Sequence, residues 1–275
     1  MDVVALIPAR YASTRFPGKP LARQTGKYLI QHVCERVAAT QRVKRCIVAT
    51  DDERIARAAE AAGARPVMTG ECSSGTDRVA QAVREIPASV VLNVQGDEPA
   101  QAPENLRLLA SFLRDRPEVA MGTLALPGTP ADLENPNVVK VVCDLSGRAL
   151  YFSRAAIPYP RNPGADLVRR HLGLYGFQKQ ALLAFASWPE TDLERTEGLE
   201  QLRALAHGMA LHVLAAVADS VAVDVPADVP RAEAALMALT RQGRRGRGPG
   251  SFDADQGSGY RAPGTGKSHS TTERK

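Results

Sequence analysis

VVALIPARYASTRFPGKP, residues 3–20, joins a short apolar run to a loop that is rich in cations. Residues 3–7 form an unbroken apolar run, which predicts a strand covered by helices on both faces. Pro8 is expected to end that strand, because proline cannot donate a hydrogen bond to a sheet ladder. In open α/β sheets, ligands bind beyond the carboxyl ends of the strands. The loop that follows Pro8 is therefore the first candidate for a binding site.

Three cations lie within this loop: Arg10, Arg15 and Lys19, the last preceded by Gly18. Cations so close together repel one another unless an anion lies among them. Arginine and lysine are also well suited to bind phosphate oxygens. The loop therefore predicts a triphosphate site in preference to an ordinary solvated surface.

Strands and helices alternate through the rest of the first half. Apolar residues recur at helical spacing over 29–38, and apolar runs at 46–50 and 90–94 predict two more buried strands. Asp51 and Asp52 are placed to cap a helix that includes residues 55–62 and ends at Gly63. This alternation indicates a parallel sheet with right-handed crossovers.

The second half has a more mixed pattern. Residues 138–142 and 149–152 predict two strands joined by a tight turn at Ser146 and Gly147. Helices are expected over 178–187, 197–207 and 228–241. Pro158, Pro160 and Pro163 mark an irregular loop between these elements, which would serve as a lid or as a dimer contact.

Several motifs occur in an order that is typical of one enzyme family. They are PARYASTRFPGKPL at 8–21, SSGTDR at 73–78, NVQGDEP at 93–99, NPNVVKVV at 135–142, ALYFSRAAIP at 149–158, RHLGLYGF at 170–177, LEQLRAL at 199–205 and VAVDVPADV at 221–229. Together they resemble the CMP-Kdo synthetases, the 3-deoxy-manno-octulosonate cytidylyltransferases, over about residues 1–238. The resemblance implies an α/β fold with a mostly parallel central sheet and helices on both faces. This fold is Rossmann-like and similar to that of the nucleotide-diphospho-sugar transferases.

The resemblance also implies a division of the chain and a function. A cytidylyltransferase domain would span residues 1–240, with a nucleotide-binding part over about 1–130, a sugar-binding and dimerisation part over about 131–220, and a metal aspartate with the last helix over about 221–240. The implied activity is Mg²⁺-dependent transfer of CMP from CTP to 3-deoxy-D-manno-octulosonate (Kdo), for lipopolysaccharide synthesis, by a cytoplasmic homodimer. Two alternatives remain: activation of a related acidic sugar such as 8-amino-Kdo, and a catalytically silent nucleotide-sugar-binding protein.

Asp97 and Asp224 are the candidate metal ligands. Each follows an apolar strand, so both carboxylates could face one cleft, and magnesium suits one or two carboxylates together with phosphate oxygens and water. The local pattern equally allows Asp97 to belong to a turn and Asp224 to cap a helix that begins near Pro226. The resemblance assigns metal binding to both, triphosphate binding to Arg10, Arg15 and Lys19, and catalysis to Lys19, Arg10 and the two aspartates.

Further candidates contact the base and the sugar. Ser74, Gly75 and Arg78 offer small polar groups and a cation for the nucleotide, although the same residues fit an ordinary turn before a helix. Gln95 matches the family's base-contacting glutamine. Cys72 stands where the family commonly carries histidine. The family's sugar-site residues match Arg154, His171, Tyr175, Glu200 and Gln201, whereas His207 and His212 are expected to be structural.

Composition excludes several other classes of protein. Residues 241–275 are predicted to be a disordered tail, and they hold eight Lys or Arg and three acidic residues. This tail carries the whole net charge of +5. The rest of the chain is formally neutral, which gives no case for a nucleic-acid-binding domain. The four cysteines have no metal-site spacing and predict reduced thiols. We find neither a secretory leader nor a membrane-spanning run. No G-x-G-x-x-G follows the first strand, and GTGKS at 264–268 lacks the first glycine of a phosphate loop.

Overall fold

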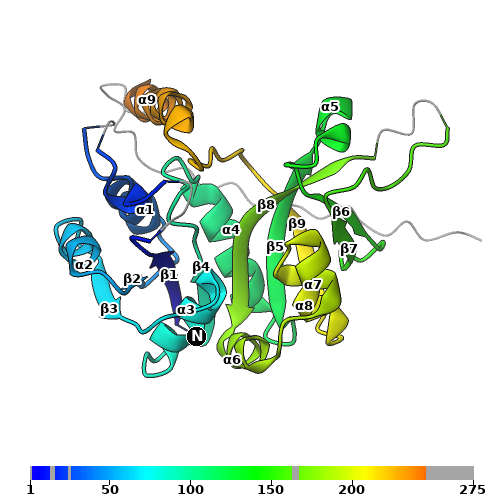
Figure 1. Cartoon of the computed structure of the whole chain (residues 1–275), viewed down its shortest axis with the longest axis horizontal. Helices are drawn as coiled ribbons and strands as arrows, with labels where there is room; N and C mark the ends of the chain where they lie inside the picture. The colour runs from blue at the N-terminus through cyan, green and yellow to red at the C-terminus, as the bar shows by residue number, and fades with distance from the viewer. Residues whose placement is uncertain (1, 13–15, 24–25, 163–166, 246–275) are drawn as a thin grey trace, which may run out of the picture.

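The computed structural model of the chain describes residues 2–12, 16–23, 26–162 and 167–245. Within these residues a nine-stranded sheet runs through the molecule in the order β3-β2-β1-β4-β8-β5-β9, with β6 and β7 beside β8 (Figure 1). The strands are β1 (Val3–Ala9), β2 (Arg45–Thr50), β3 (Arg65–Met68), β4 (Val90–Asn93), β5 (Met121–Pro127), β6 (Lys140–Cys143), β7 (Ala149–Ser153), β8 (Arg169–Gln178) and β9 (Leu211–Ala215).

Strand direction divides the sheet as the sequence predicts. β1 to β4 pair in parallel, which confirms the strand–helix alternation of the first half. β8 runs antiparallel to both β4 and β5, whereas β5 and β9 are parallel to each other. β6 and β7 form the predicted antiparallel pair. The sheet is therefore mostly parallel, with an antiparallel insertion that separates β4 from β5.

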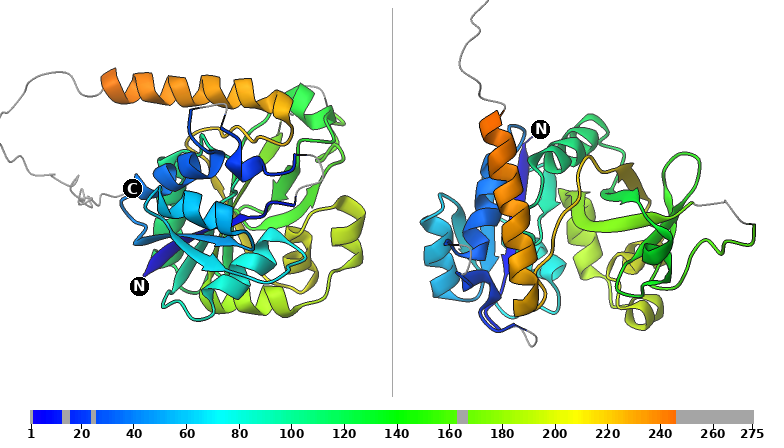
Figure 2. Two further views of the ribbon diagram at one scale, coloured as in Figure 1. Left: turned by 60° about the vertical axis from the view of Figure 1, so that its left-hand side comes forward. Right: turned by 90° about the horizontal axis from the view of Figure 1, so that it is seen from above.

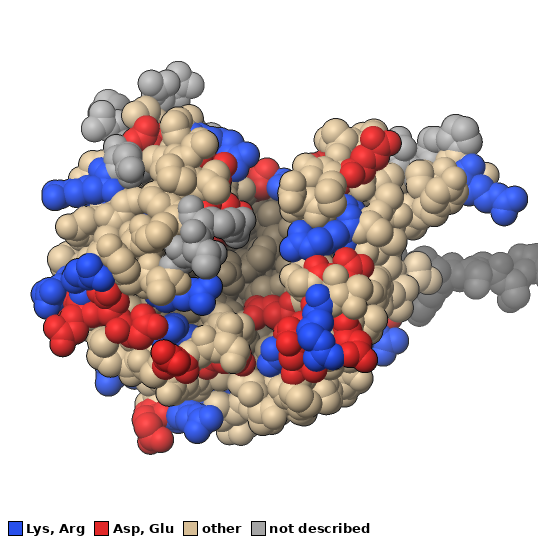
Figure 3. All heavy atoms as spheres, viewed as in Figure 1, with Lys and Arg blue, Asp and Glu red and all other residues tan. Residues whose placement is uncertain are grey.

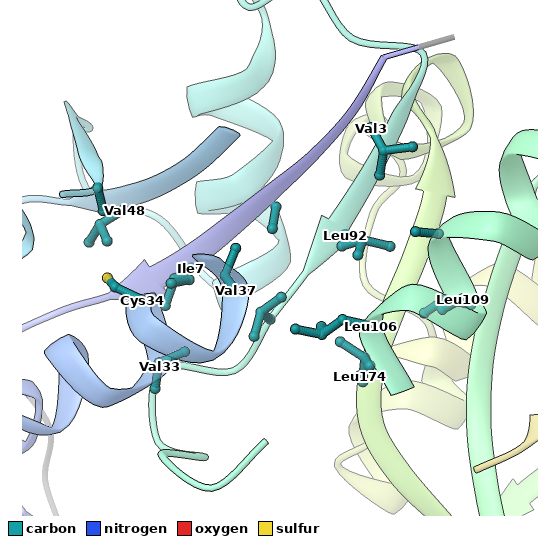
Figure 4. Close-up of a cluster of buried hydrophobic side chains, with 14 of the residues drawn as sticks. Val3, Ile7, Val33, Cys34, Val37, Val48, Leu92, Leu106, Leu109 and Leu174 are labelled. Atoms are coloured by element: carbon teal, nitrogen blue, oxygen red, sulfur yellow. The ribbon is translucent and has the colours of Figure 1, made fainter. Parts of the chain in front are cut away.

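Helices cover both faces of the sheet. They are α1 (Leu29–Ala38), α2 (Glu53–Glu60), α3 (Gly75–Val83), α4 (Pro103–Asp115), α5 (Pro130–Glu134), α6 (Lys179–Ser187), α7 (Asp192–Glu197), α8 (Gln201–Ala206) and α9 (Val229–Arg245), with 3₁₀ turns η1 (Lys19–Leu21) and η2 (Pro226–Asp228). Alternate residues of β1 point to opposite faces. Val3, Ala5 and Ile7 pack with α1, α2 and α4 (Figure 4), whereas Val4 and Leu6 pack with α3, α6 and α8.

A third, smaller cluster fixes the C-terminal helix. Leu29 at the start of α1 packs with Val223, Val229 and Ala232, so the segment after β9 returns to the first half of the chain. Figure 2 shows α9 as a long helix lying across the end of the molecule where α1 is found. This return brings residues near 224 back to the loop that follows β1.

Pro8 does not end the first strand, contrary to the sequence prediction. β1 continues to Ala9, with Pro8 in register with Ala49 of β2. The carbonyl of Leu6 accepts a hydrogen bond from Val94 on the β4 side, and by alternation Pro8 faces that side too. Pairing with β4 has already ended at Leu6, so the missing N–H of Pro8 removes no ladder bond.

Two helix predictions also need correction. The helix expected over 197–207 begins later than predicted: α8 covers Gln201–Ala206, whereas residue 197 ends the separate helix α7, which Gly198 terminates in a left-handed conformation (φ +62°). α9 continues to Arg245, a few residues past the predicted start of the disordered tail. The remaining tail residues, 246–275, lie outside the described residues, as do Pro163 and the GTGKS segment.

Two further expectations concerned the cysteine thiols and membrane-spanning helices. All four thiols are free, and Cys34 is buried between α1 and the sheet. In the part of the chain that the structure describes, no helix combines the length and the apolar character that crossing a bilayer requires.

Candidate functional site

A cavity of about 250 Å³ opens at the carboxyl ends of β1 and β4. Its lining comes from four segments, namely Pro8, Ala9 and Arg10, then Lys19 and Pro20, then Cys72, Ser73, Ser74, Gly75 and Arg78, and finally Gln95, Gly96 and Asp97, to which Asp224 is added. Figure 3 shows the molecule hollowed between two lobes, with basic and acidic side chains on the rims. Arg15 lies outside the described residues.

Lys19 lies between the two candidate metal ligands. Its Nζ is 2.7 Å from Asp97 Oδ2 and 4.0 Å from Asp224 Oδ1. Gly18 positions this lysine: its left-handed conformation (φ +70°) starts η1, and its N–H donates to the carbonyl of Tyr11 at 2.9 Å. A Cβ at Gly18 would lie 3.0 Å from the Tyr11 ring, so glycine serves both conformation and space.

Asp97 and Asp224 are joined through the backbone, although they are far apart in sequence. The N–H of Val223 donates to the carbonyl of Asp97 at 2.9 Å. Asp228, and not Asp224, caps the following turn, because its Oδ2 accepts the N–H groups of Asp224 and Val225. The alternative in which Asp224 is the helix cap is therefore wrong.

The segment around Ser74 combines a structural and a lining role. Ser74 Oγ accepts the N–H of Asp77 and caps α3, as the turn interpretation predicts, while Ser74 and Gly75 also line the cavity. Arg78 lines the same cavity but its guanidinium is committed to the protein: Nη2 contacts Asp51 Oδ2 at 2.6 Å and Nη1 donates to Thr69. Asp52 alone caps α2, because Asp51 faces Arg78.

A second cavity, of about 480 Å³, adjoins the first and shares Gln95 and Asp224 with it. All five residues that the sequence assigns to the sugar line it: Arg154, His171, Tyr175, Glu200 and Gln201. Gln95 lies where the two cavities meet. The structure thus brings the nucleotide and sugar candidates together along one continuous hollow.

Glu200 and Gln201 enter this cavity from the start of α8. Asn93 donates to Thr76 Oγ1 at 2.9 Å, and Thr76 in turn donates to Glu200 Oε1 at 2.6 Å. Burial raises the pKa of Glu200 and the Thr76 hydrogen bond opposes this rise. Within the described residues, the buried Gln201 Nε2 and Asn93 Oδ1 have no hydrogen-bond partner. Gln201 lines the cavity, so a polar ligand there is expected to pair with its Nε2, because leaving that atom unpaired is costly.

His171 is held in one neutral form. Burial lowers its pKa to about 3. Its Nε2 lies 2.9 Å from Thr123 Oγ1, and that hydroxyl already donates its only proton to the carbonyl of Leu172 or Leu174. In the tautomer that satisfies all of these contacts, Nε2 carries the proton and Nδ1 is left as an acceptor. The ring packs at 5.4 Å from that of Tyr175, whose pKa burial raises, so the phenol is neutral too.

Several residues that line the second cavity were not predicted from the sequence, among them Glu98, Arg170 and Ser220. Ser220 donates to Glu98 Oε2 at 2.6 Å, and Arg170 contacts Asp219 Oδ2 at 2.6 Å. Burial raises the pKa of Glu98 to about 7. Glu98 lies inside the motif NVQGDEP and Arg170 inside RHLGLYGF, so their positions in these motifs could have identified them as site residues. Ser220 carries no such signal.

The acidic residues at the junction suit a cation that brings its own further ligands. Among the described residues, no group of three or more His, Cys, Asp or Glu side chains could hold a metal ion alone. Asp97 and Asp224 provide two carboxylates within reach of Lys19 Nζ. Magnesium prefers such a pair when phosphate oxygens and water complete its shell. The residues therefore fit a magnesium ion that arrives with a phosphate ligand.

Comparisons with known proteins identify relatives of this chain. The family model described as cytidylyltransferase matches residues 4–211. A 3-deoxy-manno-octulosonate cytidylyltransferase of Syntrophotalea carbinolica is 46% identical over 250 residues, covering 87% of this chain and 100% of the relative. The enzyme of the same name from Myxococcus xanthus is 47% identical over 238 residues, covering 86% of this chain and 96% of its own length.

A solved structure agrees with the fold. A CMP:2-keto-3-deoxy-manno-octonic acid synthetase in complex with CTP has a TM-score of 0.83 and 39% identity, covering 87% of this chain and 100% of the other. A 4-diphosphocytidyl-2C-methyl-D-erythritol synthase from Anaerococcus prevotii, at 14% identity and a TM-score of 0.58, shares the fold alone.

Proposed function

Because this chain belongs to the 3-deoxy-manno-octulosonate cytidylyltransferases of the cytidylyltransferase family, we propose that it transfers CMP from CTP to Kdo, which yields CMP-Kdo and pyrophosphate. One observation carries the proposal: a cavity lined by phosphate-binding side chains meets a cavity lined by sugar-site side chains at Asp224 and Gln95. Two substrates bound in these cavities would have their reacting groups at the shared wall.

The first cavity takes the nucleotide. Arg10 and Lys19 line it and supply the positive charge that a triphosphate needs, and Arg15 stays a prediction for the same role. Ser74, Gly75 and Arg78 form the far wall. Because Asp51 already holds the Arg78 guanidinium, we assign Arg78 the task of shaping this wall.

Asp97 and Asp224 would hold magnesium. When bound, the metal neutralises phosphate charge and draws the two substrates together. Lys19 is placed to leave its carboxylate partners and stabilise the charge that builds on the departing pyrophosphate. The backbone hydrogen bond between Val223 and Asp97 keeps the two carboxylates at one place, so that little rearrangement is needed when the nucleotide binds.

The second cavity takes the acidic sugar. Arg154 supplies a cation for the sugar carboxylate, while His171 Nδ1 accepts from a hydroxyl and Gln201 Nε2 donates to one. Tyr175 and Glu200 complete the wall. The anomeric hydroxyl would then attack the α-phosphorus in line as pyrophosphate leaves, a reaction that depends on positioning and charge neutralisation.

The proposal also covers the cellular location and the oligomeric state of the enzyme. We assign the enzyme to the cytoplasm and to lipopolysaccharide synthesis, as a homodimer. Four large apolar side chains between residues 145 and 167 are exposed: Leu145, Leu150, Tyr159 and Leu167. Such a group favours the 131–220 part as the dimer contact. Light scattering after size exclusion tests this, and a monomer at micromolar concentration would contradict it.

Pyrophosphate release tests the activity. Purified protein with Mg²⁺ is assayed with CTP, UTP, ATP and GTP, each against Kdo, 8-amino-Kdo and N-acetylneuraminate. Release with CTP and Kdo alone is the expected result. Release with CTP and 8-amino-Kdo instead would establish the alternative sugar. No release with any pair, together with nucleotide binding by calorimetry, would establish the silent binding protein.

A further inference from the structure

Lys140 is a completely buried cation that the proposed reaction does not use. It lies on β6, and its side chain has 0% relative exposure. Its Nζ donates to three backbone carbonyls, those of Asn135 at 2.9 Å, Val138 at 2.7 Å and Arg154 at 2.6 Å. An ammonium group has three protons, and each has an acceptor. Burial of a charge is costly unless hydrogen bonds replace its water, and these three carbonyls do so.

The three carbonyls belong to the two chain segments that form one wall of the sugar cavity. Asn135 and Val138 enclose the short connection from α5 to β6, and Asn137 and Val138 line the cavity. Arg154 directly follows β7 and lines the same cavity. Lys140 therefore links the α5–β6 connection to the residue that follows β7, two segments that lie beyond the paired parts of β6 and β7.

Strand pairing places Lys140 where these segments converge. It lies opposite Ser153 of β7 and opposite Arg170 of β8. The neighbouring carbonyl of Val139 accepts the N–H of His171 at 2.9 Å. One side chain thus lies at the meeting point of β6, β7 and β8, directly behind the cavity wall.

The guanidinium of Arg154 depends on this wall for its orientation. Its Nε donates to the carbonyl of Glu197 at 2.8 Å, and its Nη1 donates to the carbonyl of Pro136 at 3.1 Å. Pro136 lies within the connection whose two sides Lys140 holds. Among the described residues, Arg154 Nη2 donates no hydrogen bond to the protein, so it is left for a ligand.

We propose that Lys140 is a positioning residue for the acidic sugar: by holding the carbonyls of Asn135, Val138 and Arg154 together, it aims the Arg154 guanidinium at the sugar carboxylate. This inference rests on the proposed function. It predicts a selective effect, because none of the three carbonyls belongs to a residue that lines the nucleotide cavity. Loss of Lys140 should weaken sugar binding and leave CTP binding nearly unchanged.

The test compares two lysines that hold carbonyls in the same way. Lys140→Met keeps the length of the side chain and removes all three donors. Lys179→Met is the matched control, because Lys179 Nζ donates to the carbonyls of Arg84 and Ile86 and lines neither cavity. For each variant, melting temperature, kcat and the KM values for CTP and for Kdo are measured.

We expect Lys140→Met to raise the KM for Kdo at least about tenfold, the effect of losing one charge-assisted contact, with the KM for CTP within about twofold of wild type. Lys179→Met should leave both KM values unchanged. An equal rise in both KM values, or a lower melting temperature with the KM for Kdo unchanged, would overturn the proposal. If Lys140→Met does not fold, Lys140→Gln replaces it, because an amide with two N–H donors leaves at least one of the three carbonyls unpaired. Folded Lys140→Gln with a KM for Kdo within about twofold of wild type would overturn it as well.

Wild-type protein separates this proposal from the proposed function. If the wild type releases pyrophosphate with CTP and Kdo, only the behaviour of the variants decides the role of Lys140. If the wild type is active with another acidic sugar, the KM values for that sugar replace those for Kdo. A wild type that is inactive with every pair contradicts both the proposed function and this inference. An active wild type whose KM for the sugar is unchanged by the Lys140 substitution contradicts the inference alone.

Discussion

Lys19 Nζ lies 2.7 Å from Asp97 Oδ2 in the first cavity, beside Asp224, which lines both cavities. The same ammonium is 4.0 Å from Asp224. A cation between two carboxylates relieves their mutual repulsion while no substrate is bound. Magnesium and the triphosphate bring further charges of both signs, and the lysine can then turn to the phosphates. This arrangement yields the first two predictions.

Asp97→Asn should lower kcat at least about a hundredfold, because the neutral amide is a poor magnesium ligand and holds the charge of the transition state less well. The side chain keeps its size, so the fold should remain intact by circular dichroism. Asp115→Asn is the matched control, since Asp115 ends α4 and pairs with its neighbour Arg114. Near-normal turnover by folded Asp97→Asn would count against its metal role.

Lys19→Met should raise the KM for CTP and lower kcat, together at least about a hundredfold in kcat/KM. The variant removes a charge that the nucleotide needs, and it leaves Asp97 and Asp224 to repel each other. Lys27→Met provides the comparison, because Lys27 pairs with Glu35 on the outside of α1. Steady-state kinetics with varied CTP measures both. If the two lysine variants had the same kinetics, Lys19 would have no part in the reaction.

His171 should make the fold sensitive to acid. Burial lowers its pKa to about 3 in the folded protein, whereas a histidine in the unfolded chain has its ordinary pKa of 6.5. The unfolded state therefore binds the proton first, and the free energy of unfolding should fall as pH drops below 6.5, by up to about 1.4 kcal/mol per pH unit. Urea denaturation of wild type and His171→Gln at pH 5, 6 and 7 measures this slope. Equal slopes for the two proteins would contradict a buried neutral imidazole.

Gly198→Ala and Gly63→Ala should lose similar stability but differ in activity. Both glycines have left-handed φ values, +62° and +77°, and a Cβ on either meets no atom within 4 Å. The strain should cost about 1–2 kcal/mol in each case. Only Gly198 lines the sugar cavity and precedes Glu200, so only Gly198→Ala should raise the KM for Kdo. Thermal melts and kinetics test the pair, and unequal losses of stability would show that backbone conformation is not the shared cause.

Truncation after Arg245 should leave turnover and RNA binding unchanged. The cut is placed at the end of α9, because a cut at residue 240 would remove part of that helix. Residues 246–275 hold five Lys or Arg and three acidic residues, so the truncation removes a net charge of only +2, which is too small to sustain RNA binding. A filter-binding assay with single-stranded RNA and the pyrophosphate assay measure both properties. Loss of turnover on truncation would assign the tail a role in the reaction.

Local patterns predicted the first half of the fold well and the second half less completely. The apolar run at residues 3–7 and the strand–helix alternation indicated parallel pairing, because that signal is local. β8 was not predicted, although it carries His171 and Tyr175. Its position between β4 and β5 depends on pairing over more than 40 residues, and two glycines interrupt its apolar pattern.

Candidate site residues came mainly from motifs, since no local pattern shows which loops meet. The sequence alone left Asp224 equally suited to a helix cap; the Asp228 hydrogen bonds exclude the cap, and metal binding by Asp224 stays a prediction. Burial of Lys140 could not be inferred either. Within VVKVV, a lysine fits the solvent face of a half-exposed strand, and its three carbonyl partners come from segments up to 14 residues away.

Gln95 and Asp224 line both cavities, so a ligand in one cavity contacts side chains that also face the other. Any movement of these side chains that CTP induces will change the affinity for the sugar. Linkage then requires the sugar to change the affinity for CTP by the same factor. If CTP moves either side chain, the affinity for each substrate depends on whether the other is already bound.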